Sequence, residues 1–413
     1  MYTCLTSASR LKLDNIDYFY KHYRKMFLTP IQKEDTRNVP EARLQELVED
    51  NKKIYSEFFD PDYLNSIIRN ICKFFDKHYF RARFIGFDEH LTRNNPERPL
   101  IYASNHSGMA FPWDAMMFGA GFLRMNDFDM KRSVRGLAAP MLSQTKLMQP
   151  YLIDDLWKRS GGVDATTLNF ETMMSYPGSD ILIYPEGIPG IGKGFNKKYK
   201  LQRFSTSFIR MSIKYKTDVI PVSTVNAEYI NPFSYNIEFI SKAVNKVGMP
   251  FLPIGLSLLL VPLQPWSFYM AFPANLTYVR GSRIKPYEMV DKPIEKLTKD
   301  DLDEVAQKVK DLMQQELDAA VMKYGKRPYN WKEFFKNTLS NPSKWAYILP
   351  WGWPLMFLEH ERQWNKGGGK PVNMKFGWFS WVGWLFKNPR AIWFFIPIIG
   401  WIPIVIRSLR DRD

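Results

Sequence analysis

This chain of 413 residues is short of several features that assign a protein to a class directly. Its two cysteines, Cys4 and Cys72, form neither a CxxC pair nor a disulfide framework, which indicates a reducing interior. Residues 1–14 lack the apolar core of a signal peptide, so we expect no export. Nucleophile-elbow, dinucleotide-binding and zinc-ligand motifs are missing as well, and we expect no bound metal.

The charge and the aromatic content are the unusual parts of the composition. Lys and Arg number 57 against 42 Asp and Glu, a formal net charge of +15, and aromatic residues make up 15%. The hydrophobic share of 45% is that of a globular chain. A basic, aromatic-rich surface suits anionic lipid headgroups, phosphate-bearing cofactors or nucleic acid, because each presents negative charge beside apolar or stackable groups. Composition alone does not choose among them.

Short apolar runs alternate with helical stretches through the middle of the chain. The runs 100–103, 181–184 and 219–222 each end at a distinctive polar group. Helical apolar spacing lies between them, as in residues 113–123. This order predicts an α/β fold with a mostly parallel sheet flanked by helices, and it places the active groups at the carboxyl ends of the strands.

The pattern divides the chain into three segments. Residues 1–75 form an N-terminal helical segment without a chemical motif, expected to pack on the core or to cover it. Residues 76–325 form the core, which begins with an alternating strand at Tyr79. The core contains another alternating strand over 266–272 and closes with an amphipathic helix over 302–317. Residues 326–413 form a tail that is rich in tryptophan.

The tail contains the longest apolar run, sixteen residues over 391–406. Pro397 and Pro403 interrupt it, and it is shorter than the roughly 20 residues that a membrane-spanning helix needs. This pattern predicts a re-entrant or interfacial membrane anchor. The alternative is a hairpin buried in the core.

His106 follows the first apolar run and precedes Ser107 and Gly108, which indicates a strand-to-helix turn. Asp114 lies eight positions further on, and a carboxylate can fix the tautomer of a histidine base. On one regular helix the two residues would stand about 12 Å apart. The loop must therefore fold back, which Gly108 and Pro112 make feasible.

A second polar group follows the second apolar run, as Pro185, Glu186 and Gly187. From Gly187 to Lys216 the chain has no acidic residue, and this predicts a phosphate-attracting surface, with a solvated helix face as the alternative. The segment has eight basic residues: Lys193, Lys197, Lys198, Lys200, Arg203, Arg210, Lys214 and Lys216.

Part of this segment comes close to a phosphate-binding loop. Gly187, Gly192 and Lys193 have the required spacing after a predicted strand. The next residue is Gly194, however, where such a loop needs Ser or Thr to ligate magnesium. The sequence therefore disfavours nucleotide hydrolysis.

Taken in order, these segments resemble the phospholipid/glycerol acyltransferase family, which includes the lysophospholipid acyltransferases. The resemblance covers about residues 80–276. Its blocks are residues 105–108 with Asp114, residues 160–163, residues 184–187 with the basic run to Phe204, the proline-bearing strand 220–222, and residues 272–276.

The resemblance implies a role for each matching residue. His106 would take the proton from an acceptor hydroxyl as that oxygen attacks an acyl thioester, and Asp114 would orient the ring. Lys193 and Arg203 would hold a phosphate of the acceptor or donor. The residues expected to contact substrate also include Asn105, Ser107, Gly162, Pro185, Glu186 and Gly187.

The resemblance also implies the partners of the protein. The donor would be acyl-CoA or acyl carrier protein, with no further cofactor, and the acceptor a lysophospholipid or other glycerolipid. The second block lacks the basic residue that grips the acceptor's phosphate in many members, which disfavours lysophosphatidate. The protein is expected at the cytoplasmic face of a membrane, on anionic lipid.

Three other functions remain open from the sequence. The first is a catalytically inactive relative that binds or tethers lipid, favoured if the loop between His106 and Asp114 breaks the pair. The second is a nucleotide enzyme that uses Lys193. The third is a nucleic-acid binder, which the tryptophan-rich apolar tail argues against. The sequence does not indicate an oligomeric state.

Overall fold

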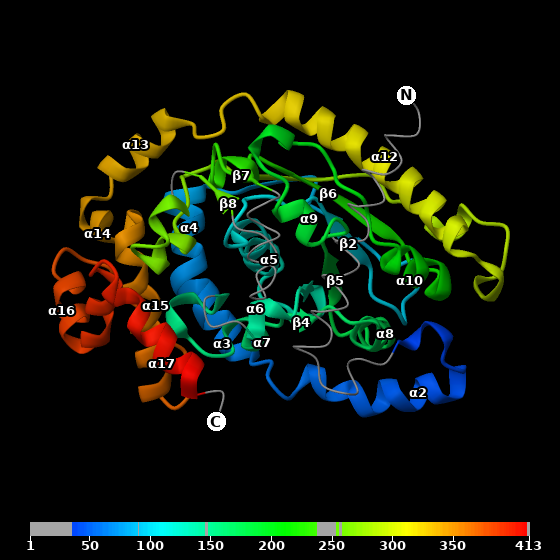
Figure 1. The fold of residues 1–413 in the computed structure, drawn as a ribbon, viewed down its shortest axis with the longest axis horizontal. Helices are drawn as coiled ribbons and strands as arrows, with labels where there is room; N and C mark the ends of the chain where they lie inside the picture. Colours follow the sequence, from blue (N-terminus) through cyan, green and yellow to red (C-terminus); the bar gives the residue numbers. More distant parts are fainter. Residues whose placement is uncertain (1–34, 90, 145–147, 238–252, 256–257, 411–413) are drawn as a thin grey trace.

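A seven-stranded sheet forms the centre of the computed structural model (Figure 1). The structure describes residues 35–410 apart from 90, 145–147, 238–252 and 256–257, so Cys4 and the first part of the N-terminal segment lie outside it. The strands in spatial order are β1 (Arg83–Ile85), β9 (Thr277–Arg280), β6 (Val219–Val225), β2 (Ile101–Ser104), β5 (Asp180–Ile183), β3 (Val134–Ala138) and β4 (Val163–Asp164). A separate hairpin pairs β7 (Tyr235–Asn236) with β8 (Pro253–Ile254).

The sheet is parallel except where β6 meets β9. The predicted α/β fold with a mostly parallel sheet flanked by helices is therefore confirmed. β2 lies between β5 and β6 and runs parallel to both. The carboxyl ends of these three strands consequently meet at one edge of the sheet, where ligands bind in folds of this kind.

Helices surround the sheet, and local signals account for several of their ends. Thr298 and Asp301 form a capping box at the start of α12, the longest described helix. The described α-helices are α2 (Glu41–Asp50), α3 (Pro61–Ile67), α4 (Lys73–Phe75), α5 (Trp113–Met125), α6 (Met141–Gln144), α7 (Leu156–Arg159), α8 (Thr167–Ser175), α9 (Ile188–Ile191), α10 (Ser207–Tyr215), α12 (Lys299–Tyr324), α13 (Trp331–Leu339), α14 (Trp345–Ile348), α15 (Trp353–Lys366), α16 (Ser380–Lys387) and α17 (Ile402–Arg410).

The two faces of the sheet belong to two hydrophobic clusters, because successive side chains of a strand point to opposite faces. Tyr102 and Leu182 pack with α3, α4, α5 and α15 on one face. Their neighbours Ile101 and Ile181 pack with α8, α10 and α12 on the other. Burial of both faces explains why these strands appear in the sequence as short apolar runs.

One predicted strand begins later than expected, and another is helical. A π-helical turn, Asp76–Phe80, continues the preceding helix through Tyr79, and β1 begins only at Arg83. Residues Pro265–Tyr269 form a 3-10 helix, which buries Trp266 and Tyr269 on one side. Residues three apart share a face of a 3-10 helix, so the alternation of aromatic residues did not indicate a strand here.

The N-terminal segment and the tail are held together by buried polar contacts. Figure 1 shows α15 beside α3. Ser66 Oγ lies 2.9 Å from His360 Nε2, and Asn70 exchanges hydrogen bonds of 2.8 and 2.9 Å with the backbone of Val372 and Met374. Both segments enter the hydrophobic cluster that covers one face of the sheet. The predicted boundaries at residues 75 and 325 are not tested by these contacts and stay predictions.

The described part of the tail consists of short helices with many exposed apolar side chains. The apolar run 391–406 is divided between the 3-10 helices Pro389–Phe394 and Ile399–Trp401 and the start of α17. Within residues 35–410, as far as they are described, no helix is long and apolar enough to cross a bilayer.

Candidate active site

His106 lies on the turn that follows β2, at the edge where β2, β5 and β6 end together. Gly108 has a φ of +113°, a left-handed conformation that favours glycine, and it turns the chain back. The helix α5 then begins at Trp113, immediately after Pro112. The loop therefore folds back as predicted, and Asp114 in the first turn of α5 reaches the His106 ring.

The imidazole and the carboxylate are hydrogen bonded. His106 Nδ1 lies 2.8 Å from Asp114 Oδ2, which confirms the predicted approach. Asp114 is fully buried, and its two oxygens also accept the backbone N–H groups of Ser107 at 3.2 Å and Ala115 at 2.9 Å. The Tyr278 hydroxyl donates to the backbone carbonyl of Asp114 at 2.7 Å. A carboxylate held at Nδ1 leaves Nε2 as the basic nitrogen of the ring.

Glu186 supports the same turn from the neighbouring strand β5. Its Oε1 accepts the backbone N–H of His106 at 3.1 Å, and its Oε2 accepts that of Gln202 at 2.6 Å. The side chain is buried. The sequence predicted that Glu186 contacts the acceptor, whereas both of its oxygens bind the protein backbone. Glu186 therefore supports the turn that holds His106, and its contact with an acceptor stays a prediction.

Lys193 is buried behind the turn, between two carboxylates. Its Nζ lies 3.4 Å from Glu228 Oε1 and 4.0 Å from Glu186 Oε2. The hydroxyl of Ser107 donates to the same Glu228 oxygen at 2.8 Å, so Ser107 also bonds within the protein. The adjoining cavity of about 10 Å³ has room for about one water molecule. The prediction that Lys193 holds a phosphate disagrees with this burial, because its charge is paired inside the protein.

Acidic residues from distant segments pair with part of the remaining basic run. Arg203 is exposed and lies 3.1 Å from Asp303 of α12, and Lys214 lies 3.1 Å from Glu171 of α8. Local sequence contained no acid, but the fold supplies these two. A contact between Arg203 and a substrate stays a prediction.

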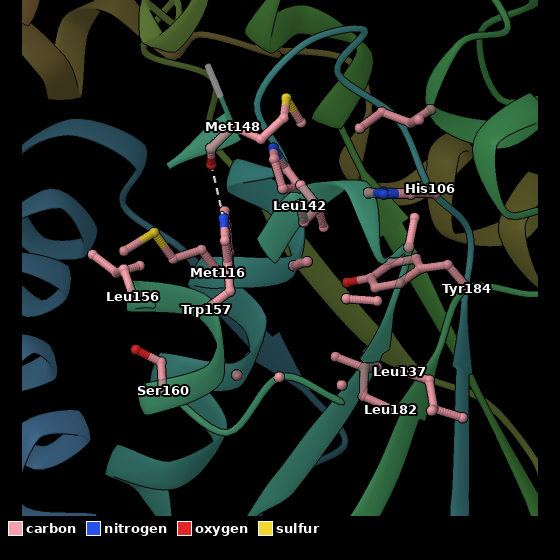
Figure 2. Close-up of a pocket in the computed structure, with 18 of the residues that line it drawn as sticks. His106, Met116, Leu137, Leu142, Met148, Leu156, Trp157, Ser160, Leu182 and Tyr184 are labelled. Carbon is pink, nitrogen blue, oxygen red and sulfur yellow. Dashed lines mark hydrogen bonds between the residues drawn. The ribbon is translucent and has the colours of Figure 1, made fainter. Parts of the chain in front are cut away.

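An apolar cavity of about 400 Å³ lies beside His106 (Figure 2). Leu64 and Ile67 of α3, Met116 of α5, and Leu137 and Leu182 of the sheet contribute to its walls. Ligand pockets of this size are usually lined by apolar side chains with a few polar groups that orient the ligand. The walls suit a hydrocarbon chain, because burial of apolar surface is favourable.

The other predicted substrate contacts divide into two groups. Gly162 and Gly187 line the apolar cavity. Asn105 instead locks β2 to β6, since its side chain exchanges hydrogen bonds of 2.9 and 2.7 Å with the backbone of Thr224. Pro185 is buried and does not line the cavity. The structure thus gives Asn105 a structural contact where the sequence predicted a substrate contact.

Tyr184 is a site residue that the sequence did not single out. Its ring packs against the imidazole of His106, with ring centroids 4.2 Å apart and planes at 30°, and it lines the same cavity. Two effects raise the pKa of Tyr184 well above its ordinary value: burial, which is the larger, and the negative charge of Asp114. The available signal was its place at the end of a strand, directly before Pro185 and Glu186.

Fold and site together define an α/β protein in which a partly exposed histidine is hydrogen bonded to a buried aspartate beside an apolar cavity. No protein-family model matches the chain. An uncharacterized protein of Mycobacterium tuberculosis is 27% identical over 197 residues, 48% of this chain and 51% of the relative. Another, from Mycobacterium leprae, is 27% identical over 220 residues, 53% of each chain. The chain spans about half the length of the curated relatives it matches.

Among solved structures, the chain is similar to the crystal structure of the 1-acyl-sn-glycerophosphate (LPA) acyltransferase PlsC from Thermotoga maritima. The alignment covers 68% of this chain and 84% of that chain, with a TM-score of 0.33 and 11% identity. Similarity at this level does not establish a common fold.

Proposed function

We propose that the protein is an O-acyltransferase that moves a fatty acyl group from acyl-CoA or acyl carrier protein to a hydroxyl of a lysophospholipid or other glycerolipid. One observation carries the proposal. The His106 ring, 2.8 Å from Asp114, lies on the wall of an apolar cavity of about 400 Å³. A base beside a hydrocarbon-sized cavity fits a reaction between a hydroxyl and a fatty acyl thioester.

In this reaction His106 moves one proton. In neutral His106 the Nδ1–H group donates a hydrogen bond to the Asp114 carboxylate, so Nε2 accepts the proton of the acceptor hydroxyl as that oxygen attacks the thioester carbonyl. The buried carboxylate stabilises the imidazolium that forms. When the carbon–sulfur bond breaks, the thiolate takes the same proton from His106. The histidine is then neutral again, and no acyl-enzyme intermediate is needed.

The tail supplies a surface for docking on a membrane with anionic lipid, at its cytoplasmic face. Scattered exposed apolar residues are ordinary, but a contiguous group marks an interaction site. Ile398 and Trp401 hydrogen bond to the backbone carbonyls of Leu263 and Pro262, which joins the tail to the loop before the 3-10 helix Pro265–Tyr269. The exposed apolar side chains of these two parts include Leu259, Leu260, Leu263, Trp378, Phe379, Phe386, Ile398 and Ile406.

The docking surface continues to the cavity. Phe268 belongs to the 3-10 helix that follows Leu263, and it also lines the cavity beside His106. Phe268 therefore links the loop that carries Leu263 to the wall of the cavity. This arrangement supports a substrate that is dissolved in the bilayer.

The test compares the wild-type protein with His106→Ala, using palmitoyl-CoA and vesicles that contain a panel of lysophospholipids. Thiol release and mass spectrometry of the lipids report the transfer. We expect His106→Ala to lower the rate by roughly 10²–10⁴-fold with an unchanged thermal unfolding curve, because a general base is lost. Equal rates in the two proteins would contradict the proposal.

The alternative functions are separated by the same assay. An inactive tether would bind the vesicles and release no thiol. A nucleotide enzyme would need Lys193 to reach phosphates, and the burial of Lys193 near Glu186 and Glu228, beside a cavity of about 10 Å³, disfavours that contact. The His–Asp pair favours catalysis over tethering.

A further inference from the structure

The Tyr184 side chain brings a hydroxyl group to the apolar cavity beside His106. Figure 2 shows the two side chains next to each other on the same wall. The hydroxyl oxygen of Tyr184 is buried and has no hydrogen-bond partner among the described residues. A buried tyrosine hydroxyl is usually paired, because leaving it unpaired costs free energy. The Tyr184 hydroxyl is therefore available to hydrogen bond to an atom of a bound substrate.

Other side-chain donors on the cavity wall are less suited to this role. Trp157 donates its ring N–H to the carbonyl of Met148 at 2.8 Å, and Ser133 donates to the carbonyl of Met130 at 2.6 Å. The hydroxyl of Ser160 also lacks a partner among the described residues. Figure 2 places Ser160 across the cavity from His106, however, whereas Tyr184 is its neighbour.

The surroundings keep Tyr184 protonated and fixed in place. Its raised pKa makes the phenol a donor throughout the neutral pH range. The packing of its ring against His106 limits rotation, so the hydroxyl is oriented before a substrate arrives. A donor oriented in advance inside an apolar cavity stabilises developing negative charge better than the same donor in water.

We propose that the Tyr184 hydroxyl donates a hydrogen bond to the thioester carbonyl oxygen and stabilises the negative charge that forms there during acyl transfer. The inference deepens the proposed function and rests on it. It makes Tyr184 a catalytic residue that touches the reacting group, and it identifies the bound ligand as a carbonyl compound with an apolar chain.

Acyl transfer proceeds in two stages, addition of the acceptor oxygen and loss of the thiolate. The acceptor oxygen bonds to the carbonyl carbon, its proton passes to His106 Nε2, and the carbonyl π electrons move onto the oxygen. Tyr184 keeps its proton and hydrogen bonds to that oxyanion. The double bond then re-forms, the carbon–sulfur bond breaks, and the thiolate takes the proton from His106.

The first test is Tyr184→Phe, which keeps the ring against His106 and removes only the hydroxyl. We expect kcat with palmitoyl-CoA to fall by roughly 10²–10³-fold, the usual effect of losing one oxyanion donor. KM should change far less than kcat, because the interaction strengthens mainly as the charge develops. Tyr55→Phe is the matched control, since the Tyr55 hydroxyl donates to the Met173 carbonyl at 3.3 Å, away from the cavity.

A second test separates hydrogen bonding from a structural effect. Two unreactive analogues of palmitoyl-CoA are compared, a ketone in which CH2 replaces the sulfur and a thioether in which CH2 replaces the carbonyl. Tyr184→Phe should bind the ketone roughly 2–10-fold more weakly than wild type, because one hydrogen bond is lost. It should bind the thioether as wild type does. Equal losses for both analogues would show a structural role and overturn the inference.

The outcomes distinguish this inference from the proposed function. Unchanged kcat in Tyr184→Phe, together with a large loss in His106→Ala, would overturn the role of Tyr184 and leave acyl transfer standing. Absence of thiol release by the wild-type protein with every acceptor would overturn both. A loss of kcat in Tyr184→Phe with unchanged thioether binding supports both.

Discussion

The carboxyl edge of the sheet and the C-terminal tail depart from the usual distribution of side chains in opposite directions. At the sheet edge, ionisable groups such as Asp114, Glu186 and Lys193 are buried. In the tail, large apolar groups such as Phe379 and Phe386 are 86% and 82% exposed. Buried charge and exposed apolar surface are the informative exceptions in a folded protein. The proposed reaction would account for the first region, and the proposed docking on a membrane would account for the second.

At the sheet edge, we expect the largest effect on activity from Asp114→Asn. The amide has the same shape but does not stabilise the imidazolium, so kcat for thiol release should fall roughly 10²–10⁴-fold. Asp129→Asn is the control, because Asp129 pairs with Arg132 at 3.7 Å on the exposed surface. Activity of Asp114→Asn within a few-fold of wild type would remove the pair from the mechanism.

Lys193→Met tests whether the buried charge at the sheet edge is structural. Removing the cation leaves the buried carboxylates of Glu186 and Glu228 without it, so the free energy of unfolding should fall by about 3–5 kcal/mol. Adding Glu228→Gln should restore part of this loss, as measured by denaturant unfolding. If stability is unchanged and KM for palmitoyl-CoA rises, Lys193 holds a substrate phosphate as the sequence predicted.

A smaller effect is expected from the tail. Replacing Phe379 and Phe386 by Ser should leave the unfolding curve unchanged, because both rings are exposed, and should weaken sedimentation with anionic vesicles. Full burial of one such ring in a membrane interface contributes about 1.5–3 kcal/mol. Met322→Ser is the control, since Met322 is 71% exposed and belongs to α12, outside the tail. Undiminished vesicle binding by the double variant would contradict docking through this surface.

The smallest effect concerns His360, a buried polar side chain outside the site. Burial lowers the pKa of His360 to about 4. In the unfolded chain His360 binds a proton below the ordinary histidine pKa of about 6.5. In the folded chain it does so only near pH 4. The contribution of neutral His360 to the free energy of unfolding is therefore complete above about pH 6.5. It is lost as the pH falls toward 4, which lowers that free energy by about 1–3 kcal/mol. Urea unfolding at pH 7 and 4.5 measures how far the free energy of unfolding falls between the two pH values. The fall should be smaller in His360→Gln than in the wild type, and an equal fall would contradict this account.

Sequence reasoning predicted the elements that depend on local pattern. The apolar runs before His106 and Glu186 are strands, and the loop from Gly108 to Asp114 folds back as the distance argument required. Alternation over a few residues was a weaker signal. It predicted strands at Tyr79 and over residues 266–272, where turns of helix bury the aromatic side chains instead.

The partners of the site residues could not be predicted, because they lie far along the chain. Glu186 binds the backbone of His106, and Lys193 meets Glu228, contacts that only the sheet order creates. In the sequence, the segment from Gly187 to Lys216 contains basic residues and no acidic residue. In the structure, Asp303 and Glu171 from other helices pair with two of the basic residues. Catalytic roles for His106, Asp114 and Tyr184 stay predictions until activity is measured.

The hydrogen bonds from Ser66 and Asn70 to the tail have a practical consequence. The helix α3 contributes a wall of the cavity. Its residue Ser66 contacts His360, and Asn70, just beyond the helix, is hydrogen bonded to Val372 and Met374. Truncating the protein near residue 340 to improve its yield would release that wall together with the docking surface. A shortened form would then be expected to fail even on water-soluble acyl donors, and its inactivity would say nothing about membranes.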